Sequence, residues 1–268
     1  MSFPAQNPGV YDGWHLEARD PGYLRDYAPV LGYYYKHYFR VEAYGVEHLP
    51  RRGPALLIGN HSGGLVAPDA AMTLYLWIQQ RGLDLPAYAL IDASVFAMEG
   101  VNVHVSKCGG LQAHPRMAKQ AIESGGVVLL YPGGASDSYR PYSRRNEIEL
   151  SGNKGFIKLA LQYGVPIVPV VTTAHNTLMV LDDGKELAQI LGLDKKGVER
   201  LPVSISMLGL SVGINFEIPF PAPFKIAVGM PLEFPGLGTR DAKDRAVVAQ
   251  CFEIARSEMQ RLLDNISG

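Results

Sequence analysis

A histidine and an aspartate, eight residues apart, form the strongest candidate for acid–base chemistry in this sequence. An apolar run over 55–58 leads to His61, the glycine pair Gly63 and Gly64 follows, and Asp69 stands just behind a proline that can open a helix. A carboxylate beside an imidazole fixes the tautomer of the ring and stabilises its charged form, as general-base catalysis requires. The spacing therefore predicts His61 as a general base oriented by Asp69. The alternative is a loop histidine followed by an unrelated aspartate at a helix start.

A second glycine pair, Gly133 and Gly134, follows the apolar run 127–131. Glycine lets a substrate approach the backbone closely, and backbone N–H groups in such a loop can face an oxyanion or a phosphate. Basic residues lie behind this loop or beside a further glycine pair at 109–110, and we expect a phosphate-binding rim from Lys107, Arg140, Arg144 and Arg145. The alternative for a run of charges is a solvated surface.

Other catalytic patterns are absent from the sequence. Ser62 lies outside any Gly-x-Ser-x-Gly elbow, and neither a phosphate-loop signature nor a dinucleotide fingerprint occurs. His104, His114 and His175 are isolated, and no His, Cys or Asp cluster has zinc spacing, so we expect no metal and no resident cofactor. A histidine base without a protein nucleophile favours direct transfer, in which a bound hydroxyl is deprotonated and attacks an activated acyl group.

The composition limits the class of protein. The chain has 268 residues, of which 47% are hydrophobic, enough for one large domain or two small ones. Its net charge of -1 argues against a nucleic-acid partner. The two cysteines match no redox or metal spacing, and no signal peptide is visible. The longest uncharged run, 201–216, is shorter than the roughly 20 apolar residues that cross a bilayer.

Short apolar runs alternate with helical patterns along the chain. Strands are expected at 39–44, 55–59, 87–91, 127–131, 167–172 and 224–228, and helices at 68–80, 116–124, 154–163 and 242–263. This alternation predicts a single α/β domain with a central, mostly parallel sheet covered by helices. Ligands of such sheets collect at strand ends, which places His61 and the loops after 131 and 172 at the candidate site.

Residues 1–38 are expected to precede the main domain, 39–268. A lead-in over 1–19 is followed by a helix that begins after Asp20 and that Pro29 kinks or splits. Residues at helical spacing predict one tyrosine-rich face: Tyr23, Tyr27, Val30, Leu31, Tyr34 and Tyr38. This face suits a membrane interface or packing against the domain. The apolar segment 203–220 also has two interpretations. It lines an acyl groove or dips into lipid, or it belongs to the core.

Four blocks in order resemble the glycerolipid acyltransferase superfamily, over roughly 40–235. The His61 block is similar to the histidine–aspartate motif of that family, and 131–134 (Tyr-Pro-Gly-Gly) stands where members carry Phe-Pro-Glu-Gly-Thr-Arg or Pro-Gly-Gly-x-x-Glu. Two later blocks, 154–170 and 228–232 (Val-Gly-Met-Pro-Leu), are similar to its closing segments. The superfamily includes lysophosphatidic acid acyltransferases and diacylglycerol-acyltransferase-like relatives.

Two departures favour a side branch related to the diacylglycerol acyltransferases. Most members have aspartate four residues after the histidine, where this sequence has Leu65, so Asp69 must return across the glycine bend. Gly133 and Ser136 replace the glutamate and arginine that hold the phosphate of the acceptor in the family, and Asp137 stands where the diacylglycerol-type branch has glutamate.

The resemblance implies an acyl-CoA:glycerolipid O-acyltransferase of phospholipid or other lipid metabolism. His61 would act without a covalent acyl-enzyme, acyl-CoA would be a co-substrate, and the loop residues Ser62, Gly63 and Gly64 would contact substrate. Lysophosphatidic acid, another lysophospholipid, or a mono- or diacylglycerol would be the acceptor. A cytoplasmic protein bound peripherally to a membrane is expected. The alternatives are a catalytically silent lipid-binding protein on the same fold and a serine-type lipid hydrolase.

Overall fold

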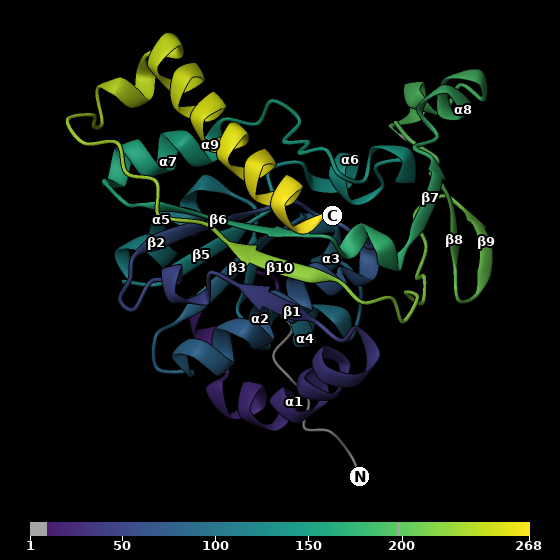
Figure 1. Ribbon diagram of the computed structural model, residues 1–268, viewed down its shortest axis with the longest axis horizontal. Helices are drawn as coiled ribbons and strands as arrows, with labels where there is room; N and C mark the ends of the chain where they lie inside the picture. Colours follow the sequence, from purple (N-terminus) through teal and green to yellow (C-terminus); the bar gives the residue numbers. More distant parts are fainter. Residues whose placement is uncertain (1–9, 198) are drawn as a thin grey trace.

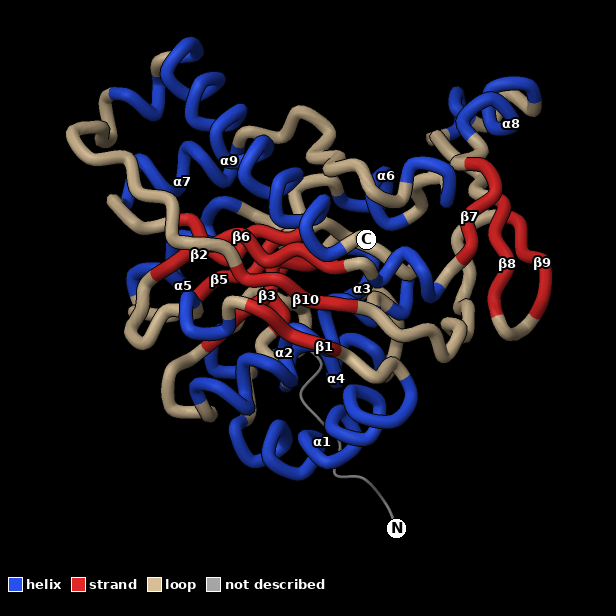
Figure 2. The backbone as a smooth tube through the Cα atoms, viewed as in Figure 1, coloured by secondary structure: helices blue, strands red, loops and turns tan. Residues whose placement is uncertain are grey.

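The computed structural model describes residues 10–197 and 199–268, and a seven-stranded sheet lies at its centre (Figure 1, Figure 2). In spatial order its strands are β1 (Glu42–Tyr44), β10 (Lys225–Val228), β6 (Ile167–Thr172), β2 (Ala55–Gly59), β5 (Val127–Leu130), β3 (Ala87–Ile91) and β4 (Gly110–Gln112). The strands from β6 to β4 are parallel to one another, while β10 is antiparallel to β6 and parallel to β1. The expected α/β fold with a mostly parallel sheet is therefore confirmed.

The central strands are apolar throughout because both faces of the sheet are covered. In β2, Leu56 and Ile58 enter the core on one face, and Ala55 and Leu57 enter the core on the other. Since successive side chains of a strand point to opposite faces, a continuous apolar run is what a sheet covered on both sides requires. The parallel register, with Leu57 beside Leu129 of β5 and Val168 of β6, brings the carboxyl ends of these strands to one edge.

Helices cover the two faces in separate groups. One core is closed by α5 (Pro115–Glu123), α7 (Gly155–Tyr163) and α9 (Arg245–Ile266). The opposite core receives side chains from α1 (Pro21–Tyr33), the π-helix Tyr34–Tyr38 and α2 (Pro68–Arg81). The short helices α3 (Ala93–Phe96) and α4 (Val101–Lys107) connect β3 to β4, and α6 (Gly134–Ser138) follows β5. The helix α4 and strand β4 lie in a region to which the sequence pattern assigned no element.

The N-terminal helix packs on the domain with a different face from the expected one. Leu24, Leu31 and Tyr35 are buried, whereas Val30, Tyr33 and Tyr34 are exposed. Pro29 lies inside α1 without ending it, and the tyrosine run continues as a π-helix, so the 3.6-residue spacing shifts at Tyr34. The expected single tyrosine-rich face is therefore divided between the core and solvent.

Part of the expected lead-in is packed. Residues 1–9 of it lie outside the described part of the chain. Trp14 and Leu16 contact the core on the α9 side, and the Gln112 N–H of the edge strand β4 donates to the carbonyl of Gly13 at 2.9 Å. This segment covers the edge of the large sheet at β4.

A second, antiparallel sheet projects from the body, and the sequence pattern did not predict it. It contains β7 (Met179–Asp182), β8 (Val203–Ser206) and β9 (Gly209–Val212) in that order, with α8 (Lys185–Ile190) between β7 and β8. It lies at the right of Figure 1, beside the carboxyl ends of the parallel strands. Within residues 10–197 and 199–268, none of the helices combines the length and apolar character needed to cross a bilayer.

Candidate functional site

His61 lies two residues beyond the end of β2, in a loop that its glycines allow to turn back. Gly63 and Gly64 have φ values of +84° and +67°, a region that residues with a side chain rarely adopt. A Cβ on Gly63 would also lie 2.4 Å from Pro68, at the first position of α2. The loop therefore closes tightly, and the first turn of α2 faces the imidazole.

Asp69 makes the contact with the ring that the spacing predicted. Nδ1 of His61 lies 2.9 Å from Oδ2 of Asp69, and the same oxygen accepts the Ser62 N–H at 3.0 Å. The Asp69 side chain is 0% exposed and that of His61 is 20% exposed, so the acid is enclosed while the ring is reachable. The position of Asp69 in the first turn of a helix also favours its negative charge.

The carboxylate makes the imidazole more basic. Burial alone would lower the pKa of His61, but the charge of Asp69 and its hydrogen bond outweigh burial, and Asp137 adds to them. The pKa of His61 therefore lies above its ordinary value of 6.5. With Nδ1 engaged by Asp69, Nε2 is the ring nitrogen able to take a proton from a substrate.

Tyr131 supports the flat face of the imidazole. It follows β5, the strand next to β2, and its ring stacks on that of His61 at 4.7 Å between centroids with 22° between the planes. The stack fixes the tilt of the ring, which a single hydrogen bond to Asp69 leaves free.

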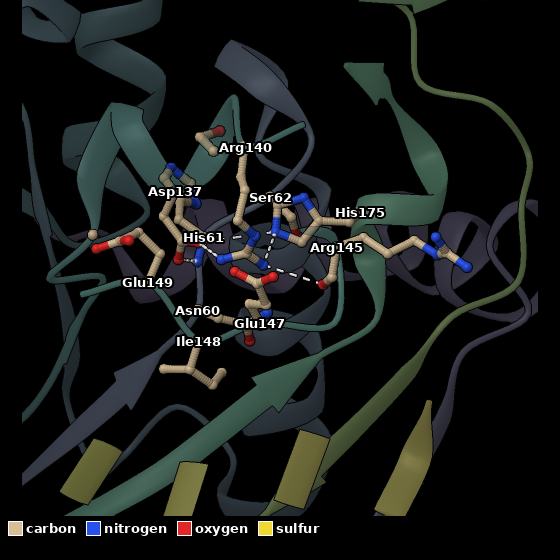
Figure 3. A network of polar contacts seen from close by, with 12 residues as sticks. Asn60, His61, Ser62, Asp137, Arg140, Arg145, Glu147, Ile148, Glu149 and His175 are labelled. Carbon is tan, nitrogen blue, oxygen red and sulfur yellow. Dashed lines mark hydrogen bonds and ion pairs between the residues drawn. The ribbon is translucent and has the colours of Figure 1, made fainter. Parts of the chain in front are cut away.

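A second buried carboxylate, Asp137, holds the backbone of the same histidine. Its Oδ2 accepts the His61 N–H at 2.6 Å, and its Oδ1 pairs with the Arg140 guanidinium, one turn further along (Figure 3). Asp137 reaches this position because α6 starts directly after β5. A Cβ on Gly133 would lie 2.2 Å from the carbonyl oxygen of Glu149, so this glycine permits two backbones to approach. Burial raises the pKa of Asp137 to about 7 against the opposing effect of Arg140.

Arg140 is a structural cation rather than a surface charge. It is 1% exposed, and besides Asp137 it donates to the carbonyl of Arg145 at 3.1 Å and to Nε2 of His175 at 2.8 Å. Burial and the neighbouring guanidinium lower the pKa of His175 well below 6.5, so this imidazole is neutral and its Nε2 can accept. The chain of contacts runs from the His61 backbone through Asp137 and Arg140 to the loop after β6 (Figure 3).

Asn60 and Glu217 connect the histidine loop to its neighbours. The Asn60 amide donates to the carbonyl of Thr172 at 2.9 Å and accepts its N–H at 2.7 Å, which joins the ends of β2 and β6. Glu217, 2% exposed, accepts from Ser204 of β8 and from Tyr139. A Cβ on Gly64 would lie 2.7 Å from its Oε2, so the loop is packed against this carboxyl.

The structure separates the residues expected to bind substrate. Ser62, Gly63 and Gly64 lie in the His61 loop, but the Ser62 hydroxyl is buried, and no hydrogen bond to it occurs within 10–197 and 199–268. The Gly134 N–H donates to the carbonyl of Tyr131 at 3.1 Å, so the turn itself uses this donor. Lys107 precedes β4 and therefore lies at the amino ends of the parallel strands, across the sheet from His61, with its ammonium 5.3 Å from the ring of Tyr23.

The remaining arginines differ from Arg140. Arg144 is exposed and pairs with Glu147 at 2.7 Å, while Arg145 lies over the ring of Tyr142 and points away from the network in Figure 3. A pocket of about 290 Å³ adjoins α6 and is lined by Ser136, Arg140, Pro141, Arg144, Glu149, Ser151, Asp183 and Arg200. It is polar and carries charges of both signs. Among the described residues, no group of three or more His, Cys, Asp and Glu side chains is arranged to hold a metal ion.

Four residues of the site were missed by the sequence reasoning: Asn60, Tyr131, His175 and Glu217. His175 was considered isolated because its partner lies 35 residues away in the chain. Its loop, just after the apolar run 167–172, was nevertheless expected at the candidate site, as were the loops after β2 and β5 that hold Asn60 and Tyr131. Nothing in the sequence pattern pointed to Glu217.

Comparisons with known proteins show which family the chain is similar to. The family model described as Acyltransferase matches residues 40–173. An uncharacterized protein of Mycobacterium tuberculosis (strain ATCC 25618 / H37Rv) is 28% identical over 237 residues, 88% of this chain and 64% of that protein. Diacylglycerol O-acyltransferase 2 of Homo sapiens is 26% identical over 118 residues, 42% of this chain and 30% of that enzyme. This chain thus spans less than two thirds of the length of the mycobacterial relative.

A solved structure shares the fold. The crystal structure of the 1-acyl-sn-glycerophosphate (LPA) acyltransferase from Thermotoga maritima superposes with a TM-score of 0.51 at 15% identity. The match covers 91% of this chain and 83% of that one. At this identity the likeness concerns the arrangement of strands and helices.

Proposed function

Because this chain belongs to the acyltransferase family, within the glycerolipid acyltransferase superfamily, we propose that it transfers a fatty acyl group from acyl-CoA to a hydroxyl of a glycerolipid. The observation that carries the proposal is the His61 imidazole, made basic by a fully buried Asp69 and itself 20% exposed. The likeness to diacylglycerol O-acyltransferase 2 supports a glycerolipid acceptor.

In the proposed reaction, Nε2 of His61 takes the proton of the acceptor hydroxyl while the hydroxyl oxygen attacks the thioester carbonyl carbon. The tetrahedral intermediate collapses, the carbon–sulfur bond breaks, and the CoA thiolate leaves with the proton from the imidazolium. The products are an ester and free CoA, and His61 returns to its neutral form. Asp69 stabilises the imidazolium that exists between these two proton transfers.

The surroundings of the histidine support direct transfer over an acyl-enzyme. A serine nucleophile needs an exposed hydroxyl within hydrogen-bond reach of its base. Ser62 is 0% exposed, and its contact with the catalytic pair is through its backbone N–H, which donates to Asp69. A serine-type lipid hydrolase is thus the weaker candidate, and His61 acts on the substrate hydroxyl itself.

Phosphate groups of the substrates need cations at the surface. Arg140 is committed to Asp137 and His175, so we assign this role to Arg144, which is exposed and lines the pocket beside α6. Its pairs with Glu147 and Glu149 are at the surface, where an ion pair is worth little and a phosphate can replace one partner.

The test is acyl transfer from one labelled acyl-CoA to a panel of acceptors: lysophosphatidic acid, other lysophospholipids, monoacylglycerol and diacylglycerol. Release of CoA and formation of labelled product are followed together. We expect transfer to at least one acceptor, its loss in His61→Ala, and its retention in His15→Ala, which removes a surface histidine. A folded protein that binds acyl-CoA but transfers to none of these acceptors would instead be a lipid-binding protein.

We extend the proposal to peripheral association with a membrane, because glycerolipid acceptors are held in bilayers. Liposome flotation of the purified protein tests it, and recovery of all the protein from the lipid-free fractions would contradict it.

A further inference from the structure

The small sheet presents an apolar face to solvent. Its register places Met179, Ile205 and Leu210 side by side across the three strands, and Val203 beside Val212. Directly opposed residues of antiparallel strands share a face. Met179, Leu210 and Val212 are exposed, with Leu210 at 69%. This row is therefore the outer surface of the sheet, and Asp182, which opposes Val203 at an irregular position, marks its border.

The face turned to the body carries two buried serines beside Val180, which lies opposite Ser204 and is also buried. Ser204 pairs with Ser211, Ser204 and Ser206 are buried, and the Ser204 hydroxyl donates to Glu217 at 3.0 Å. A sheet that covers a core normally buries its apolar side chains and exposes its polar ones. Apart from Val180, the β7–β9 sheet does the reverse, and the hydrogen bond from Ser204 to Glu217 holds it in that orientation.

The apolar surface continues beyond the sheet. The turn between β8 and β9 exposes Met207 and Leu208, the latter at 68%, and Ile214, Phe216 and Ile218 alternate outward around the buried Glu217. Residues 201–216 contain no charged side chain. Exposed apolar patches of this extent mark surfaces that another apolar phase covers.

The base of the sheet touches the catalytic loop. Leu178, which precedes β7, forms a small core with Tyr139 and Val180, and a Cβ on Gly64 would lie 3.0 Å from Leu178. Glu217 lies at the same point and bridges Ser204 of β8 to Tyr139. The sheet that carries the apolar surface is thus anchored, through its buried side, beside the loop that carries His61.

We propose that the outward face of the β7–β9 sheet, with its 207–208 turn, inserts into the surface of a glycerophospholipid bilayer and delivers acceptor lipid to the His61 loop. The delivery role depends on the function proposed above, whereas the binding does not. The absence of charge over 201–216 makes the attraction apolar, so a zwitterionic bilayer suffices and added salt does not release the protein. A second copy of this chain is the competing occupant.

The experiment is flotation of the full chain with phosphatidylcholine vesicles, at low and at high salt. We expect binding in both, and a loss of partitioning of about tenfold or more in Leu208→Ser/Leu210→Ser, because both side chains are already exposed and their replacement leaves the core intact. The matched control, Val30→Ser/Tyr33→Ser, removes exposed apolar groups from the N-terminal helix and should bind as the unaltered protein does.

Three outcomes would overturn the inference: no flotation, equal binding of the β8–β9 variant, or weaker binding of the N-terminal control alone. A dimer in light scattering that Leu208→Ser/Leu210→Ser disperses, without vesicle binding, would assign the face to a second copy. Binding by a protein that transfers no acyl group would leave this inference standing while the proposed function fails. Acyl transfer to a detergent-dispersed acceptor, by a protein that does not float with vesicles, would support the proposed function and contradict this inference.

Discussion

The seven-stranded sheet and the β7–β9 sheet differ in the side chains they bury. The large sheet encloses apolar side chains on both faces and keeps its polar groups at the carboxyl ends of its strands, where His61, Asp137 and His175 meet. The small sheet encloses Ser204 and Ser206 together with Val180, and it exposes Met179, Leu210 and Val212. The large sheet is thus completed by its own helices, whereas the small sheet leaves an apolar face exposed among the described residues, the face that we propose a bilayer covers.

Replacing His61 should have the largest effect, a loss of acyl transfer at the large sheet without a loss of vesicle binding by the small sheet. His61→Ala should lower the rate of acyl transfer about 10²–10⁴-fold, the range for loss of general-base assistance, and leave vesicle binding unchanged. Leu208→Ser/Leu210→Ser should weaken vesicle binding and leave transfer to a detergent-dispersed acceptor unchanged. Initial rates and flotation on the same preparations measure both, and a variant that lost both properties would argue against two separable regions.

Breaking the buried ion pair should lower stability strongly. Arg140→Met removes the buried cation that Asp137, the carbonyl of Arg145 and His175 contact, and we expect the free energy of unfolding to fall by about 3–5 kcal/mol. Arg144→Met is the matched control, since Arg144–Glu147 has the same three-residue spacing at the surface and should change it by less than about 1 kcal/mol. Urea unfolding measures both, and equal losses in the two variants would refute the contrast between a buried and an exposed pair.

The pH dependence of transfer reports the Asp69–His61 contact. A general base must be neutral, so the rate should rise with pH through the pKa of His61, which lies above 6.5. Asp69→Asn removes the charge that raises this pKa, and the acidic limb of kcat/KM should move to lower pH by about 1–3 units, with a lower plateau. An unshifted limb would mean that another group controls it.

The smallest expected effect concerns the ring beneath His61. Tyr131→Leu removes a stacked aromatic contact worth about 0.5–1.5 kcal/mol, which corresponds to a loss of about 2- to 12-fold in kcat if the stack acts on the reactive ring orientation. Tyr131→Phe keeps the stack and should stay within about twofold of the unaltered protein. Equal losses in the two variants would assign the effect to the hydroxyl group.

The sequence predicted the large sheet well because its strands are apolar over their full length. The runs 55–59, 87–91 and 167–172 have the bounds of β2, β3 and β6. Strand ends that depend on tertiary contacts were predicted less accurately. Residues 39–44 were expected as one strand, but Phe39 closes the π-helix and only Glu42–Tyr44 pairs with β10. The β7–β9 sheet was missed because an apolar segment with alternating serines looks the same whether its apolar side faces a core or solvent.

The candidate site was predicted in part for a similar reason. His61 and Asp69 are near in sequence, and a glycine bend sufficed to expect their contact, which is present. Several contacts of the network beneath them join residues 35 to 112 positions apart, as in His175 with Arg140 and Thr172 with Asn60, and no local spacing reports such pairs. Arg140 was expected in a phosphate-binding rim, with a solvated surface as the alternative, and its burial follows from partners that only the fold supplies.

Two adjacent loop amides donate to different carboxylates, His61 N–H to Asp137 and Ser62 N–H to Asp69. Backbone amides in loops usually exchange with solvent deuterium quickly, because such segments open at low free energy. Here exchange at either position requires the hydrogen bond to a carboxylate to break. Both amides should therefore retain their protons as long as the amides inside the large sheet do. Slow exchange would then mark the two amides next to the reactive imidazole.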